Sequence, residues 1–177
     1  REPAAVEVVT RFLRANVFAT FAQIKDWSRL PVRLLKTITA QMLEQGSIIE
    51  MAVDGLGTGF VRREDQSLPR VDTPDSVLML HKADPLVKAH ATELKARFGH
   101  EETLQYLLVD GELKGAVIGH WRIGPHDVED VVLLLDDDEC RRRREAVLSA
   151  IARVYSPPRS QIRNYCGESI GLVSEIV

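Results

Sequence analysis

The stretch from Thr20 to Arg63, TFAQIKDWSRLPVRLLKTITAQMLEQGSIIEMAVDGLGTGFVRR, decides the fold of the first third of the chain. Thr20 is a good N-cap residue, so the pattern predicts a short helix over 21–28. Arg29 and Leu30 then form a tight turn. Pro31 suits the first position of a third helix, where its missing N–H costs nothing. Gly46 is typical of a helix end, so we expect this helix to stop at about residue 45.

A β-hairpin is expected directly after this helix. The run 48–53 is apolar and partly β-branched, the run 54–59 is rich in glycine, and 60–62 is typical of a returning strand. Before the quoted stretch, apolar residues at helical spacing predict a first helix over 3–16, joined to the second by a short link at 17–19. Three helices followed by a hairpin are the layout of a winged helix-turn-helix, here over residues 1–63.

The third helix separates into two faces when its residues are placed at steps of 100°. One face is apolar and must be core: Leu34, Leu35, Ile38 and Met42. The opposite face carries the residues that we expect to meet duplex DNA: Arg33, Lys36, Thr37 and Ala40. Arginine can read guanine and lysine can neutralise phosphate, while Ala40 permits a close backbone approach. After the hairpin, Arg62 and Arg63 are expected to contact the DNA backbone.

The charge of the chain is uneven. The net charge is −3, yet residues 1–63 carry nine Lys or Arg and six Asp or Glu, a balance of +3. This favours DNA binding by the first part alone. The two cysteines form no Cys-x-x-Cys pair, and no apolar run is long enough for a membrane span, so we expect a cytoplasmic protein without a metal or other cofactor. The chain begins at Arg1, so the sequence leaves open that it is part of a longer protein.

The remainder predicts a linker over 64–76 and a β-rich α+β domain with two helices over 77–177. Strands are expected at 77–80, 103–109, 113–120 and 128–135. One helix should open at Asp84-Pro85 and run to Phe98, with Val87, Ala91, Leu94 and Phe98 on its buried stripe. A second should open at 136–139, with Val147, Leu148, Ile151 and Tyr155 inward. The tail from residue 159 has the weakest pattern, and no secondary structure is predicted for it.

Several patterns favour structural over chemical roles. The four arginines of 141–144 follow four acids at 136–139, and i, i+4 pairs are expected at Asp137–Arg141, Asp138–Arg142 and Glu139–Arg143. The glycines of 54–59 lack the lysine of a phosphate-binding loop and are expected to let the hairpin tip bend. No His-x-x-x-His pair occurs among the histidines. Trp121 is expected in the core of the second domain.

A family resemblance covers about residues 5–155. The segments Phe12-Leu13-Arg14, Val77 to Leu86 and Leu107 to Gly115 resemble bacterial winged-helix DNA-binding proteins that include the alkylation-specific, crosslink-unhooking DNA glycosylases. The resemblance implies that glycosylase chemistry would need a Gln-x-Gln or Gln-x-Asp motif. None of the six glutamines has such a partner two residues on, which favours binding over catalysis.

The sequence therefore predicts a DNA-binding protein, auxiliary to DNA repair or transcriptional regulation, with no catalytic residue. Two alternatives stay open: the chain is the C-terminal part of a DNA glycosylase, or its winged helix binds a protein. The second domain is a candidate for protein contact or self-association.

Overall fold

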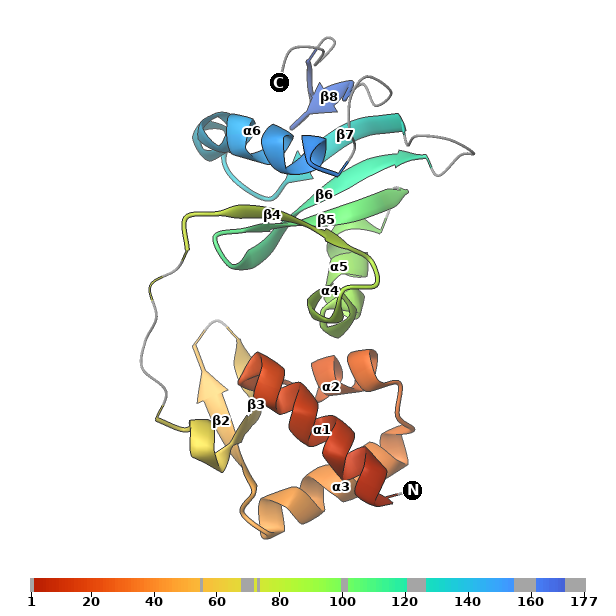
Figure 1. The fold of residues 1–177 in the computed structure, drawn as a ribbon, viewed down its shortest axis with the longest axis vertical. Helices are drawn as coiled ribbons and strands as arrows, with labels where there is room; N and C mark the ends of the chain where they lie inside the picture. The colour runs from red at the N-terminus through yellow and green to blue at the C-terminus, as the bar shows by residue number, and fades with distance from the viewer. Residues whose placement is uncertain are drawn as a thin grey trace. The chain divides into compact units, whose positions relative to one another are not determined.

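A computed structural model describes residues 2–54, 56–67, 72, 74–99, 102–120, 127–154 and 162–170. Within these residues the chain is α+β, with six α-helices and two sheets. It divides into two compact units, drawn in Figure 1. The first comprises Arg1–Val71 and Lys88–Thr92, and the second comprises Asp72–Val87 and Glu93–Val177. No helix among the described residues is long and apolar enough to cross a membrane.

The first unit begins with three helices, α1 (Glu2–Asn16), α2 (Phe21–Ser28) and α3 (Val32–Glu44). Thr20 caps α2 as predicted: its hydroxyl accepts from the backbone N–H of Gln23, and the Gln23 side chain accepts from the N–H of Thr20. This reciprocal pair satisfies two amides that the helix itself leaves open. Pro31 stands at the N-cap of α3, one position before the first-turn site expected for it. Gly46, at φ +68°, follows the helix end.

A three-stranded antiparallel sheet completes this unit, in the order β1-β3-β2, as Figure 1 shows in part. Its strands are β1 (Phe18–Ala19), β2 (Ile48–Val53) and β3 (Gly57–Arg62). The link expected at 17–19 is thus partly a strand, and β3 begins three residues earlier than predicted. Two-residue strands are invisible to periodicity, because alternation needs at least four residues to register.

The core of the first unit lies between the three helices and the sheet. Helix α3 contributes its predicted apolar face, of which Leu35 and Ile38 are fully buried. They pack with Phe12, Leu13 and Ile24 from the other two helices. Trp27 stacks on Phe12 with the ring centroids 4.6 Å apart. Burial of the apolar face of α3 therefore determines which face of the helix points away from this core.

The second unit is built on a six-stranded sheet of order β4-β5-β6-β7-β8-β9. Its strands are β4 (Val77–His81), β5 (Thr103–Val109), β6 (Glu112–His120), β7 (Asp127–Leu133), β8 (Asn164–Tyr165) and β9 (Glu168–Ser169). All neighbours are antiparallel except β7 and β8, which are parallel. The strands at 164–169 were not predicted, because each has only two residues.

Helices cover both faces of this sheet (Figure 1). Helix α6 (Asp137–Ala152) packs Val147, Leu148 and Ile151 against one face, as predicted. The other face is covered by α5 (Ala91–Phe98) through Leu94 and Phe98, and by Val87. Two separate helices, α4 (Pro85–Ala89) and α5, replace the single helix expected over 84–98. The described residues of the second part of the chain therefore form three helices where two were expected. The predicted positions of Trp121 and Tyr155 lie outside the described residues.

Candidate nucleic-acid interface

The outward face of α3 gathers four of the six residues predicted to bind DNA. Each is exposed, whereas the core residues of the same helix are buried. The four are Arg33, Lys36, Thr37 and Ala40. Among the described residues neither Arg33 nor Lys36 has an ion-pair partner, so both cations face solvent uncompensated. This face offers two positive charges and a small residue within about two helical turns.

Thr37 is tied to its own helix. Its hydroxyl donates to the carbonyl oxygen of Arg33 at 3.1 Å. That bond uses the only hydroxyl proton but leaves the oxygen lone pairs directed outward. Thr37 can therefore accept a hydrogen bond from a base edge, but it can donate to a phosphate only by giving up the bond to Arg33.

Arg62, at the end of β3, is already engaged. Its Nε donates to Asp65 Oδ2 at 2.6 Å and its Nη2 to Asp65 Oδ1 at 2.9 Å, which is a two-pronged pair, and its Nη1 contacts Glu64. The Arg62 side chain is only 16% exposed. Two acids in the short 3₁₀ turn Arg63–Asp65 thus neutralise this cation. A phosphate that binds Arg62 would have to displace one of these carboxylates. Arg62 therefore contributes less positive potential than the neighbouring Arg63.

Arg63 points to the far end of α3. Its Nε donates to the carbonyl oxygen of Gly46 at 2.6 Å, and its backbone N–H donates to Ser47. The guanidinium is exposed and is anchored to a backbone carbonyl just beyond the end of α3. Arg33 in the first turn and Arg63 beyond the last therefore place cations at both ends of one helix, about 15–20 Å apart by the rise of α3.

Gly59, expected to help the hairpin tip bend, has a different role. A Cβ at this position would lie 2.6 Å from Phe18 Cζ and 2.7 Å from the carbonyl oxygen of Ala19. Glycine is therefore required for the close approach of β1 to β3. Gly57, at φ +78°, is the first residue of β3 after the hairpin turn and has a conformation that favours glycine.

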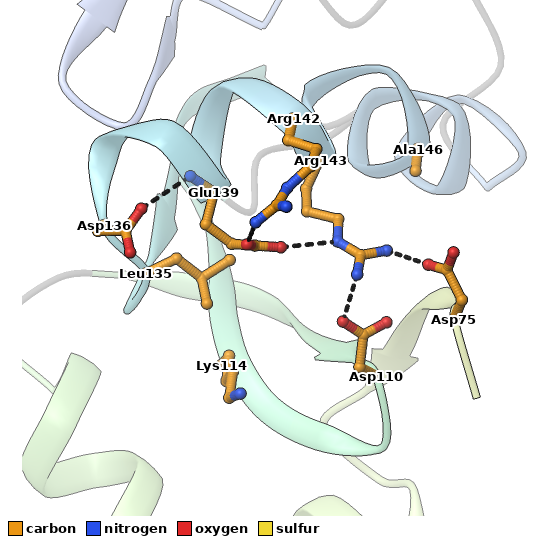
Figure 2. A pocket seen from close by; sticks show the side chains of 9 residues that line it. All are labelled: Asp75, Asp110, Lys114, Leu135, Asp136, Glu139, Arg142, Arg143 and Ala146. Carbon is orange, nitrogen blue, oxygen red and sulfur yellow. Dashed lines mark hydrogen bonds and ion pairs between the residues drawn. The ribbon is translucent and has the colours of Figure 1, made fainter. Parts of the chain in front are cut away.

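The second unit has a pocket of about 680 Å³ between α6 and the β5–β6 turn. Figure 2 shows the Arg143 guanidinium at its centre, surrounded by carboxylates from three segments. Arg143 donates to Asp110 at 2.6 Å and to Glu139 at 3.0 Å, and it also contacts Asp75. The hydrogen bond to Asp75 raises the pKa of Arg143 above its ordinary value. Positive and negative side chains in this pocket compensate one another, which is typical of an ion-pair cluster that holds structure together. We call Arg143 with Asp75, Asp110 and Glu139 the clasp around Arg143.

The predicted pairing of the arginine run is only partly correct. Glu139–Arg143 forms at i, i+4 as expected. Arg141 pairs with Asp138 and Arg142 with Glu139, both at i, i+3, in place of the two other predicted pairs. Sequence reasoning missed the partners Asp75 and Asp110, because they lie 68 and 33 residues from Arg143. The sole local signal was the turn at Asp110 and Gly111, both at positive φ.

No three His, Cys, Asp or Glu side chains within the described ranges are grouped to hold a metal ion.

Comparison with known proteins supplies the family. The family model described as "DNA glycosylase AlkZ-like" matches residues 1–156. Comparison with curated proteins found no match. Comparison with solved structures found none either. The family match spans both units and agrees with the DNA-repair side of the resemblance seen in the sequence. The chain belongs to the DNA glycosylase AlkZ-like family.

Proposed function

We propose that the first unit is a winged helix-turn-helix that binds duplex DNA, with α3 as the recognition helix and the β2–β3 hairpin as the wing. The observation that carries this proposal is the outward face of α3, where Arg33 and Lys36 are exposed and uncompensated among the described residues. Exposed cations on a helix face outside the core can neutralise phosphates of the DNA backbone and donate hydrogen bonds to base edges in the major groove.

The residues take different parts in this proposal. Arg33 lies in the first turn of α3 and is the base-reading candidate, because its guanidinium can fork onto guanine. Lys36 neutralises phosphate, Thr37 accepts from a base edge, and Ala40 lets the helix approach the groove. Arg63 contacts the backbone next to the far end of the helix. Arg62 contacts phosphate only where Asp65 is displaced, so its contribution should be the smallest.

The family supports a repair context for this binding. The resemblance implies that catalysis needs a glutamine motif that this chain lacks, so we propose a non-catalytic, DNA-positioning role for it. The second candidate is that the chain is part of a DNA glycosylase whose catalytic residues lie in another segment. The family match favours this candidate over the protein-binding alternative, because the matched family is described by an activity on DNA.

The test is fluorescence anisotropy of a labelled random duplex over a range of salt concentrations. The double variant Arg33→Ala/Lys36→Ala should bind about 10- to 100-fold more weakly, and its salt slope should be shallower by about 1–2. The control Arg11→Ala/Arg14→Ala removes the same charge from exposed positions of α1 in the same unit.

An equal loss in both double variants would mean that only total charge matters, and would refute α3 as the recognition helix. No binding at low salt would refute DNA binding and favour the protein-binding alternative. Release of a base from an alkylated duplex by the chain alone would refute the non-catalytic role.

A further inference from the structure

The two cysteines meet in the second unit, although 26 residues separate them. Cys140 lies in the first turn of α6 and Cys166 in the turn between β8 and β9. The Cys166 thiol donates to Cys140 Sγ at 3.1 Å, and both cysteines are free. A disulfide bond is about 2.05 Å long, so the two sulfurs need to approach by only about 1 Å to become bonded.

Cys166 is held in this position by its backbone. Its N–H donates to the carbonyl oxygen of Val131 at 2.8 Å. Cys166 and Gly167 have φ of +50° and +78°, which are the two central positions of a tight hairpin turn. The first of these positions ordinarily takes Asn, Asp or Gly, and a cysteine there carries backbone strain. The contact with Cys140 gives a physical reason for a thiol at this site.

The partner thiol is equally well placed. Cys140 is buried, and its carbonyl oxygen accepts a hydrogen bond of 2.7 Å from the Tyr165 hydroxyl. Because Tyr165 directly precedes Cys166, this bond fixes the hairpin against the start of α6. Separate hydrogen bonds to the backbone of each cysteine thus hold the two residues in place. The two sulfurs therefore lie close together before any reaction.

We propose that Cys140 and Cys166 are a reversible oxidation site, at which a two-electron oxidant such as hydrogen peroxide forms a disulfide that clamps the β8–β9 hairpin to α6. The half-buried Cys166 reacts first: its thiolate attacks a peroxide oxygen, the O–O bond breaks, and sulfenic acid and hydroxide result. Cys140 sulfur then attacks Cys166 sulfur and displaces hydroxide. In sum, two thiols and one peroxide give one disulfide and two waters.

The reaction should be slow at neutral pH and faster in base. Burial and the neighbouring Cys140 raise the pKa of Cys166 to about 12, and only the thiolate attacks. The rate should therefore rise about tenfold per pH unit between pH 7 and 10. The product closes a loop of 26 residues, which should lower the unfolding equilibrium constant of the second unit by roughly a few hundredfold.

The experiment treats the purified chain with hydrogen peroxide at pH 7 and pH 9, and counts thiols after denaturation. The proposal expects two thiols to fall to none, a mass loss of about two hydrogens, a proteolytic peptide that joins Cys140 to Cys166, and full reversal by dithiothreitol. The chain should remain monomeric on a non-reducing gel.

Two cysteine variants make the result decisive. Cys166→Ser should keep its one buried thiol under the same treatment, whereas Cys140→Ser should stop at sulfenic acid on Cys166, detectable by dimedone labelling. Two intact thiols in the native chain, an intermolecular crosslink, or sulfinic acid at both cysteines without a crosslink would each overturn the proposal.

Discussion

Replacing Gly59 with alanine tests the close approach of β1 to β3 in the first unit. The added Cβ would lie 2.6 Å from Phe18 Cζ and 2.7 Å from the carbonyl oxygen of Ala19. The phenyl ring can rotate away, but the Ala19 carbonyl belongs to β1, which pairs with β3 at Phe60. Relief of the clash therefore needs a backbone shift, and overpacking of this kind costs about 1–3 kcal/mol.

Thermal unfolding measured through Trp27 fluorescence checks this value. Trp27 stacks on Phe12 in the core of the first unit, so in a Trp121→Phe background its signal reports this unit alone. For a unit of this size each kcal/mol lowers the melting temperature by about 4–8 °C, so Gly59→Ala should lower it by about 5–20 °C. The control is Thr58→Ala, an exposed neighbour on the same strand, which should change stability by about 0.5 kcal/mol or less. A melting temperature for Gly59→Ala equal to that of the control would refute the close approach of β1 to β3.

Three further predictions concern the second unit. Gln105→Met should stabilise it by about 1–2 kcal/mol in urea denaturation, because the buried Gln105 Oε1 has no hydrogen-bond partner among the residues that the structure describes; a loss of stability would show that this amide is satisfied. Arg143→Ala should destabilise it more than Arg141→Ala does, since Asp110 and Glu139 would lose their shared cation, whereas Arg141→Ala removes only an exposed pair and should cost no more than about 0.5 kcal/mol. Stability should fall as the pH rises from 9 toward 12, because the pKa of Cys166 is raised from 9.0 to about 12 in the folded chain and the unfolded chain releases that proton first; a Cys166→Ser variant with an unchanged slope would contradict this.

The sequence predicted the elements whose signals are local. The Thr20 cap, the apolar stripe of α3 and the glycine after it were each legible within one or two turns of helix. The same holds for the buried side of α6. These predictions agree with the structure because burial and capping act between neighbours along the chain.

What the sequence did not predict depends on contacts between distant segments. Strand β1 exists because Phe18 and Ala19 lie against β3, about 40 residues away, and nothing in the link itself indicates a strand. The clasp around Arg143 and the contact between the two cysteines depend on the packing of α6 in the same way. The break between α4 and α5 has no proline or glycine to mark it, and we have no local account of it.

The sequence predicted which residues share the outward face of α3. It did not predict that Arg62 and Arg63 have partners that make their charges unequally available to a ligand. Helical periodicity places Arg33, Lys36, Thr37 and Ala40 together. It says nothing of Asp65, which neutralises Arg62, or of Gly46, which orients Arg63. Whether a surface arginine is available to a ligand is decided by its partners, and those partners come from the folded structure.

A nuclear magnetic resonance titration of the ¹⁵N-labelled chain with a short duplex tests directly whether α3 binds DNA. Such a titration shows which backbone amides change their chemical shift when the duplex binds, for weak as well as tight binding. If α3 is the recognition helix, the largest shifts fall on its outward face, from Arg33 to Ala40, and on Arg63 with the β2–β3 hairpin. Shifts confined to the second unit, with α3 unchanged at saturating duplex, would contradict it.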